Sequence, residues 1–105
     1  DVKKIEEMSA GVARMVNDSV TAYVERDLEL ARKVMEADDN IDGLFDDIRR
    51  SIINLIAEGN RGEQGVDLIM IAKYLERIGD HATNIAEWVE FSITGVHKGA
   101  QAVEA

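Results

Sequence analysis

The sequence predicts an all-α protein: an antiparallel, up-down-up bundle of three long helices with a spectrin-like layout. Apolar residues recur at intervals of three and four through three long segments, which is the spacing of one helix face. The chain has no proline, the residue that interrupts helices, and no stretch alternates apolar and polar residues as a strand would. Because 105 residues suffice for one modest core, residues 1–105 are expected to form a single domain.

The first two helices are expected at about residues 2–25 and 27–58. A break between them is favoured over one bent helix, because Asp27 can cap a new helix and Glu29 suits its first turn. The residues predicted to face the core are Ile5, Met8, Val12, Met15, Val16, Ser19 and Tyr23 in the first helix, and Leu30, Val34, Ala37, Ile41, Leu44, Phe45, Ile48, Ile52 and Leu55 in the second.

The third helix is expected at about residues 66–94. The glycine-rich stretch GNRGEQG (59–65) predicts the preceding loop, with Gly59 just past the second helix and Gly95 closing the third. Residues 96–105 are expected to fray. The core direction of the third helix is set by Leu68, Ile71, Leu75, Ala82, Val89 and Ile93.

Gly79 is an unusual residue for the middle of a helix. It shares the core side with Ala72 and Ala86, and a row of small residues lets a neighbouring helix approach closely. That packing is expected to offset the loss of about 1 kcal/mol of helix propensity.

The charge of the chain restricts its partners. It has 21 acidic and 12 basic residues, a formal net charge of −9, and a pI near 4.6. Nucleic acid and anionic lipid are therefore disfavoured, because both require basic surfaces, and cations or a basic protein surface are favoured. The absence of cysteine excludes thiolate metal sites. No apolar run approaches the roughly 20 residues of a membrane span, and the start DVKKIEEM does not resemble a signal peptide, so a cytoplasmic protein without membrane insertion is expected.

The acidic residues of the second and third helices are concentrated on particular sides. At about 100° per residue, Asp38 lies roughly 55° and Asp42 roughly 95° from the core direction of the second helix. Glu76, Asp80 and Glu87 lie roughly 110–150° from that of the third helix, in the same rotational sense. Because neighbouring helices run antiparallel, the two acidic rows are expected to face each other across the seam between them.

Asp38 with Asp42, and Glu76 with Asp80, form two i, i+4 pairs, which are neighbours on a helix surface. Carboxylates placed in this way repel each other, and a divalent or trivalent cation relieves the repulsion. Ligand sets made only of oxygen suit hard metals such as Mg, Ca, Mn or ferric iron. Solvated acidic faces without a metal are also common, so the spacing leaves both interpretations open.

The remaining polar residues near Gly79 carry weaker signals. His81 lies off the apolar face and fits a surface residue better than a ligand. Asn84 could support a ligand or bond a neighbouring backbone group. Trp88, the only tryptophan, lies outside the main apolar stripe and is a candidate contact with another domain or subunit.

Two enzyme classes that use helical bundles are disfavoured. Di-iron carboxylate oxidases use Glu-x-x-His pairs, but Ile78 and Thr94 are the residues three before His81 and His97. Histidine phosphotransfer sites have Lys and Gly just after the histidine, whereas residues 82–84 are Ala-Thr-Asn. We therefore expect no enzymatic activity.

Two stretches resemble the PhoU family of phosphate-transport regulators. One is LERIGDHATNIAEW (75–88), preceded by DLIMIAKY; the other is ERDLELARKVMEADDNIDGLFDDI (25–48), similar to the family pattern ERDxxLAxxVxxxDxxID. Family members contain two tandem three-helix bundles. The resemblance therefore implies that this chain is one repeat of such a protein, most like the second, or a single-repeat relative. The face that packs on the other repeat would then be exposed, and a homodimer is expected.

The resemblance also implies a site and a function. Family members bind metal ions, iron among them, through Glu/Asp-x-x-x-Asp motifs, which match Asp38 with Asp42 and Glu76 with Asp80; manganese, zinc, magnesium and calcium are further possibilities. Asp39, Asn84 and Glu87 are weaker candidates. Family members restrain phosphate uptake between the Pst transporter, with its ATPase, and the PhoR sensor histidine kinase on the cytoplasmic side of the membrane. The alternative is a metal-free adaptor whose acidic face docks a basic partner.

Overall fold

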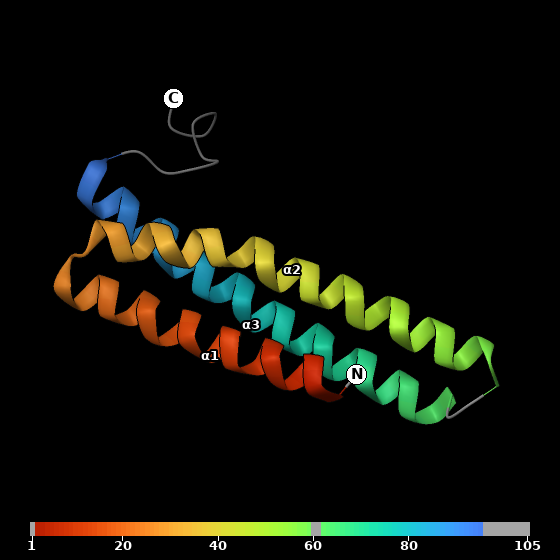
Figure 1. The fold of residues 1–105 in the computed structure, drawn as a ribbon. Helices are drawn as coiled ribbons and strands as arrows, with labels where there is room; N and C mark the ends of the chain where they lie inside the picture. Colours follow the sequence, from red (N-terminus) through yellow and green to blue (C-terminus); the bar gives the residue numbers. More distant parts are fainter. Residues whose placement is uncertain (1, 60–61, 96–105) are drawn as a thin grey trace.

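The computed structural model describes residues 2–59 and 62–95, which form three helices: α1 (Val2–Glu25), α2 (Leu28–Ala57) and α3 (Gly62–Thr94). Figure 1 shows the helices side by side, with α2 running opposite to α1 and α3. Each helix packs against both others, so the predicted all-α, three-helix architecture is confirmed. None of the three helices is long and apolar enough to cross a membrane.

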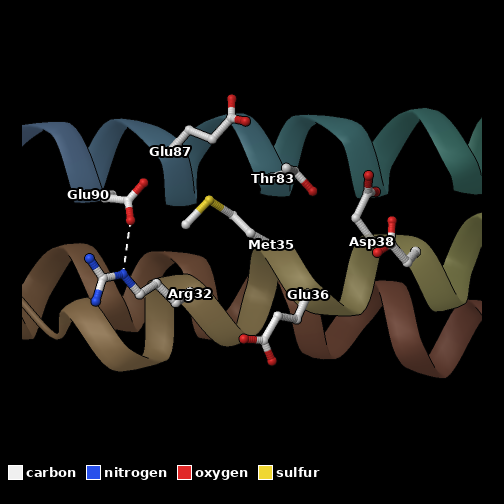
Figure 2. A pocket seen from close by; sticks show the side chains of 8 residues that line it. Arg32, Met35, Glu36, Asp38, Thr83, Glu87 and Glu90 are labelled. Atoms are coloured by element: carbon white, nitrogen blue, oxygen red, sulfur yellow. Dashed lines mark hydrogen bonds and ion pairs between the residues drawn. The ribbon is translucent and has the colours of Figure 1, made fainter. Parts of the chain in front are cut away.

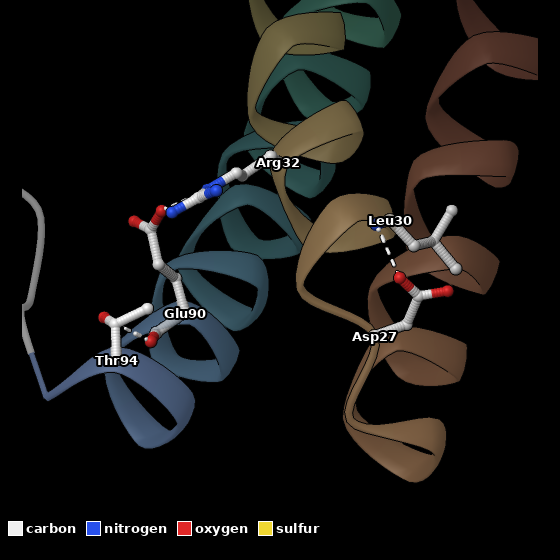
Figure 3. Close-up of polar contacts among 5 residues, drawn as sticks. All are labelled: Asp27, Leu30, Arg32, Glu90 and Thr94. Atoms are coloured by element: carbon white, nitrogen blue, oxygen red, sulfur yellow. Dashed lines mark hydrogen bonds and ion pairs between the residues drawn. The ribbon is translucent and has the colours of Figure 1, made fainter.

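The predicted break between the first two helices is confirmed. Arg26 adopts the left-handed conformation with a φ of 52°, and the Asp27 amide donates to the Ala22 carbonyl at 2.9 Å, which ends α1. The Asp27 carboxylate then accepts from the Leu30 amide at 3.0 Å (Figure 3). This N-cap satisfies one of the free amides at the start of α2.

The third helix begins earlier than predicted. Gly59 has a φ of +79° after the end of α2, and Gly95 has a φ of +78° after α3, as expected for glycines that follow helices. However, α3 starts at Gly62 instead of residue 66. The reason is tertiary packing: Gly65 is buried, and a Cβ there would lie 3.0 Å from the Ile52 side chain. The predicted fraying of residues 96–105 lies outside the described residues.

The core combines large side chains from two helices with small ones from the third. Most of the predicted positions in α1 and α2 are buried, and the largest fully buried side chains there are Met8, Met15, Ile41, Ile48 and Ile52. The buried residues of α3 are Gly65, Ala72, Gly79, Ala82, Ala86 and Val89. The core is therefore filled by interdigitation of large and small residues, and α3 approaches the other helices with its smallest face.

Two residues predicted for the core are on the surface instead. Ile71 is 47% exposed and Tyr23 is 61% exposed. The buried face of α3 is turned by roughly 35° from the predicted direction, because the space between α1 and α2 admits Ala72 and Gly79 but not a row of isoleucines. This rotation brings the acidic side of α3 closer to α2.

Substitution of Gly79 tests how tightly the buried face of α3 is packed. A Cβ at Gly79 would lie 3.7 Å from both Ile41 and Val12, which is ordinary contact, so alanine fits and glycine is not required. We expect Gly79→Ala to raise the free energy of unfolding by about 1 kcal/mol through helix propensity, measured by denaturant unfolding. Gly43→Ala is the control, since nothing lies within 4 Å of its Cβ position.

Gly65→Ala should gain less than either, or lose stability, because Ile52 must shift to make room. A clear loss of stability in Gly79→Ala would contradict the packing described for α3.

Candidate metal centre

The acidic rows of α2 and α3 meet across their seam. Single carboxylate oxygens of Asp38 and Asp42, from α2, and of Asp80, from α3, all lie within 4.8 Å of one another. Asp38 is half-buried, whereas Asp42 and Asp80 are exposed. The structure therefore brings three of the four predicted ligand residues together, as the same-sense displacement of the two rows predicts.

Asp38 has the most unusual environment of the three. Its Oδ1 is buried and accepts no hydrogen bond within the described part of the chain. Thr83 faces the Asp38 carboxylate from α3 (Figure 2), and its hydroxyl also donates to the Gly79 carbonyl at 3.0 Å. A buried carboxylate oxygen without a donor is costly, so this atom lacks a positive partner.

The cluster also alters proton affinity. Burial, followed by repulsion from Asp42 and Asp80, raises the pKa of Asp38 above its ordinary value. Desolvation, followed by repulsion from Glu76 and Asp80, raises the pKa of Asp42 as well, although water screens this exposed side chain more. A side-chain hydrogen bond from Thr83 lowers the pKa of Asp38 by less than burial and repulsion raise it, so the described residues compensate the negative charges of the cluster only in part.

Glu76, the fourth predicted ligand residue, is near the cluster but is already paired. Its charge acts on Asp42, yet its Oε1 lies 3.3 Å from the Lys73 ammonium group. Lys73 also lies over the Phe45 ring of α2, 5.0 Å from its centroid. The Oε1 of Glu76 can therefore join the three aspartates only if Lys73 gives way.

A groove of about 480 Å³ continues from Asp38 along the seam. Its lining includes two of the weaker ligand candidates, Asp39 and Glu87, but not Asn84, which is exposed. At the far end the Arg32 Nε donates to Glu90 Oε2 at 2.9 Å and joins the two helices (Figures 2 and 3). Sequence reasoning missed this ion pair, because it depends on the register of α2 against α3.

The residues present fit a hard metal ion. Oxygen ligands lie 2.3–2.6 Å from Ca²⁺ and closer to Mg²⁺, so two oxygens on one ion are at most about 5 Å apart. The separations among Asp38, Asp42 and Asp80 are within this limit. None of these three carboxylates has an ion-pair partner among residues 2–59 and 62–95. The donor set and the orphaned Oδ1 of Asp38 thus meet the requirements of a cation site.

Comparison with known proteins gives consistent matches. The family model of the PhoU domain matches residues 5–89. A phosphate-specific transport system accessory protein PhoU homolog of Clostridium acetobutylicum is 40% identical over 95 residues. The Thermotoga maritima homolog 1 is 39% identical over 95 residues, and the Zymomonas mobilis homolog is 44% identical over 89. No solved structure gives a significant match.

These matches cover most of this chain but less than half of the relatives. The three alignments include 90%, 90% and 84% of the chain, and 43%, 41% and 38% of the respective relatives. The chain thus spans about two fifths of the length of the curated relatives it matches, enough to account for one three-helix bundle.

The uncompensated charge predicts how stability depends on pH. Folded Asp38 binds its proton more tightly than the unfolded chain does. Its ionisation therefore destabilises the fold as pH rises from about 3.9, the ordinary value, through the raised pKa, and the loss is constant above it. We expect Asp38→Asn to raise the Tm of the metal-free protein at pH 7, and this gain to shrink as pH falls toward 4.

Asp67→Asn is the control for the change in net charge, because Asp67 is an exposed residue of α3 outside the cluster. Thermal unfolding followed by circular dichroism provides the measurement. A lower Tm for Asp38→Asn at pH 7 would show that Asp38 is compensated in the fold.

Proposed function

This chain belongs to the PhoU family, and we propose that it is a regulator of phosphate uptake that holds a metal ion between α2 and α3. The family match over residues 5–89 and the names of the relatives support an accessory role in a phosphate-specific transport system. In this proposal the domain restrains the transporter, contacts its ATPase on the cytoplasmic side, and signals to the sensor histidine kinase. It carries out no chemical step of its own.

One observation supports the metal in particular. Asp38, Asp42 and Asp80 gather on facing helices, and no Lys or Arg among residues 2–59 and 62–95 forms an ion pair with them. When bound, a metal ion would supply the missing positive charge and cross-link α2 to α3. Iron is the first choice by family resemblance, and manganese, zinc, magnesium or calcium would suit the same oxygen ligands.

The chain's own residues have distinct roles in this proposal. Asp38 offers a buried oxygen, and Thr83, whose hydroxyl donates to the Gly79 carbonyl, faces it from α3. Asp42 and Asp80 close the site from the solvent side. Glu76 forms an ion pair with Lys73 at 3.3 Å, so we expect it to contribute less to metal binding than the three aspartates.

A second candidate function rests on the groove beside the cluster. Four carboxylates from Glu36, Asp39, Glu87 and Glu90 line it together with Asp38, and Arg32 is the one cation among the described residues that line it. A Lys or Arg side chain of a basic partner would fit this groove without any metal. The chain would then be an adaptor whose acidic face docks that partner.

Metal removal and addition should test the site directly. Elemental analysis of the purified chain is expected to find stoichiometric metal that a chelator removes. Metal at 100 times its Kd should stabilise the apo protein by about 2.7 kcal/mol, a rise in Tm of roughly 10–20 °C for a domain of this size. Asp42→Asn and Asp80→Asn should abolish this rise, whereas Glu76→Gln should reduce it and Asp67→Asn should leave it intact.

The adaptor alternative gives the opposite pattern. In that case no metal binds or stabilises the wild type, and Asp39→Asn or Glu87→Gln weakens binding of a lysine-rich peptide. Such a result would contradict the proposed metal site without contradicting the proposed regulatory role.

The regulatory role requires a cellular measurement. In phosphate-replete cells that lack their own copy of the gene, the wild-type chain is expected to lower the initial rate of radiolabelled phosphate uptake. The Asp42→Asn/Asp80→Asn chain should restore less of this restraint than Asp67→Asn, at equal protein levels. Uptake that is the same with and without the wild-type chain contradicts the regulatory role, whatever the metal analysis shows.

A further inference from the structure

Two basic residues of α3 each lie three residues before an acidic residue of the proposed metal centre. Lys73 precedes Glu76, and Arg77 precedes Asp80. Residues three apart are neighbours on a helix surface, so both spacings suit an ion pair. The Lys73 Nζ donates to Glu76 Oε1 at 3.3 Å, whereas no ion pair joins Arg77 to Asp80. Spacing alone therefore does not decide which basic residue engages the centre.

Aromatic rings distinguish the two basic residues. The Lys73 ammonium lies 5.0 Å from the centroid of the Phe45 ring, which belongs to the facing helix α2. The Arg77 guanidinium lies 5.9 Å from the centroid of Tyr74, an exposed residue of α3 itself. A cation is attracted to a ring face at such distances. Tyr74 lies about 120° around α3 from Asp80, so Arg77 is held on another side of the helix, whereas Phe45 holds Lys73 at the seam.

The contacts of Lys73 lie about one helical turn from the three aspartates. Phe45 follows Asp42 by three residues on α2. Glu76 precedes Asp80 by four residues on α3, and one turn rises about 5.4 Å. The Glu76 side chain is 20% exposed, and its charge is, after desolvation, the largest cause of the raised pKa of Asp42. Glu76 therefore acts on the cluster while it is paired with Lys73.

We propose that Lys73 limits the metal affinity of the site between α2 and α3 by competing with the metal ion for Glu76. This inference rests on the metal site proposed above and assigns its regulation to a residue that is not a ligand. The ammonium group has two opposite effects. It stabilises the metal-free fold by pairing with Glu76 and with the Phe45 ring, and it weakens metal binding by repelling the ion and occupying a carboxylate.

A purely structural role for Lys73 predicts a different result. If Lys73 only joins α3 to α2, its loss lowers stability and leaves metal binding unchanged or weaker. Competition for Glu76 predicts that the same loss lowers the stability of the metal-free protein and strengthens metal binding. The two measurements must therefore change in opposite senses for the proposal to hold.

Lys73→Met is the variant that tests the competition. Methionine keeps a long apolar stem and a high helix propensity, so the helical circular dichroism spectrum should persist. The Tm of the metal-free protein should fall by roughly 2–5 °C, because an exposed ion pair and a cation–π contact each contribute little. Calorimetric titration with Mn²⁺ should give a Kd roughly five- to tenfold lower than that of the wild type, because one more carboxylate is free to bind. Lys73→Arg keeps the charge and should leave the Kd within about twofold of the wild type.

Arg77→Met is the matched control for the loss of charge. It removes the same unit of positive charge one turn further along α3, but Arg77 engages no carboxylate of the cluster. At physiological ionic strength a unit charge about 8 Å from a divalent ion changes its Kd by only about twofold. Arg77→Met should therefore strengthen Mn²⁺ binding by no more than about twofold, clearly less than Lys73→Met.

A double-mutant cycle shows whether the competition acts through Glu76. In the wild type, Glu76→Gln should weaken Mn²⁺ binding only about twofold, because Lys73 already occupies this carboxylate. In the Lys73→Met chain, the same substitution should remove the gain and weaken binding roughly five- to tenfold. A gain that persists in the double variant would show that Lys73 acts by charge alone, which contradicts the proposal.

The possible failures are distinguishable. If the wild type binds Mn²⁺ and Lys73→Met binds it no more tightly than Arg77→Met does, the competition is wrong and the metal site remains. If neither the wild type nor Lys73→Met binds Mn²⁺, the metal site itself is wrong, and the competition with it.

Discussion

The structure depends on one packing constraint, which is that α3 presents its smallest residues to the core. Ala72, Gly79 and Ala86 fill the narrow space left by the isoleucines and methionines of α1 and α2. The burial of these small residues fixes the rotation of α3 about its axis, and the rotation determines which residues its other two sides present. One side brings Asp80 to Asp38 and Asp42, and the other leaves Ile71, Ile78 and Ile85 exposed on the surface.

Much of this arrangement can be predicted from short sequence patterns, before the structure is known. The cap at Asp27 and the glycines at 59 and 95 mark three of the helix ends, and the Ile41, Ile48 and Ile52 row marks the buried face of α2. The acidic rows could be predicted to meet, because their displacement on two antiparallel helices is a matter of wheel geometry. The position of Asp38 beside the apolar face of α2 was enough to predict that its carboxylate would be partly buried.

The rest depends on tertiary packing that no local pattern encodes. Ile71 fits a buried helical stripe as well as Leu75 does, and only the shape of the space between α1 and α2 excludes it. The start of α3 at Gly62 reflects burial of Gly65 against Ile52, which overrides the low helix propensity of glycine. Likewise, the pairing of Glu76 with Lys73, and of Arg32 with Glu90, depends on rotamers and on helix register.

The most direct test of this account is to locate a bound paramagnetic metal by NMR. Substoichiometric Mn²⁺ added to isotope-labelled, metal-free protein should broaden amide signals around residues 38–42 and 76–83, and leave those near Asp67 and Val20 sharp. That result would show that the rotation of α3 builds a cation site from two helices. Broadening spread evenly over all exposed acidic residues, or absent at Asp38, Asp42 and Asp80, would contradict it.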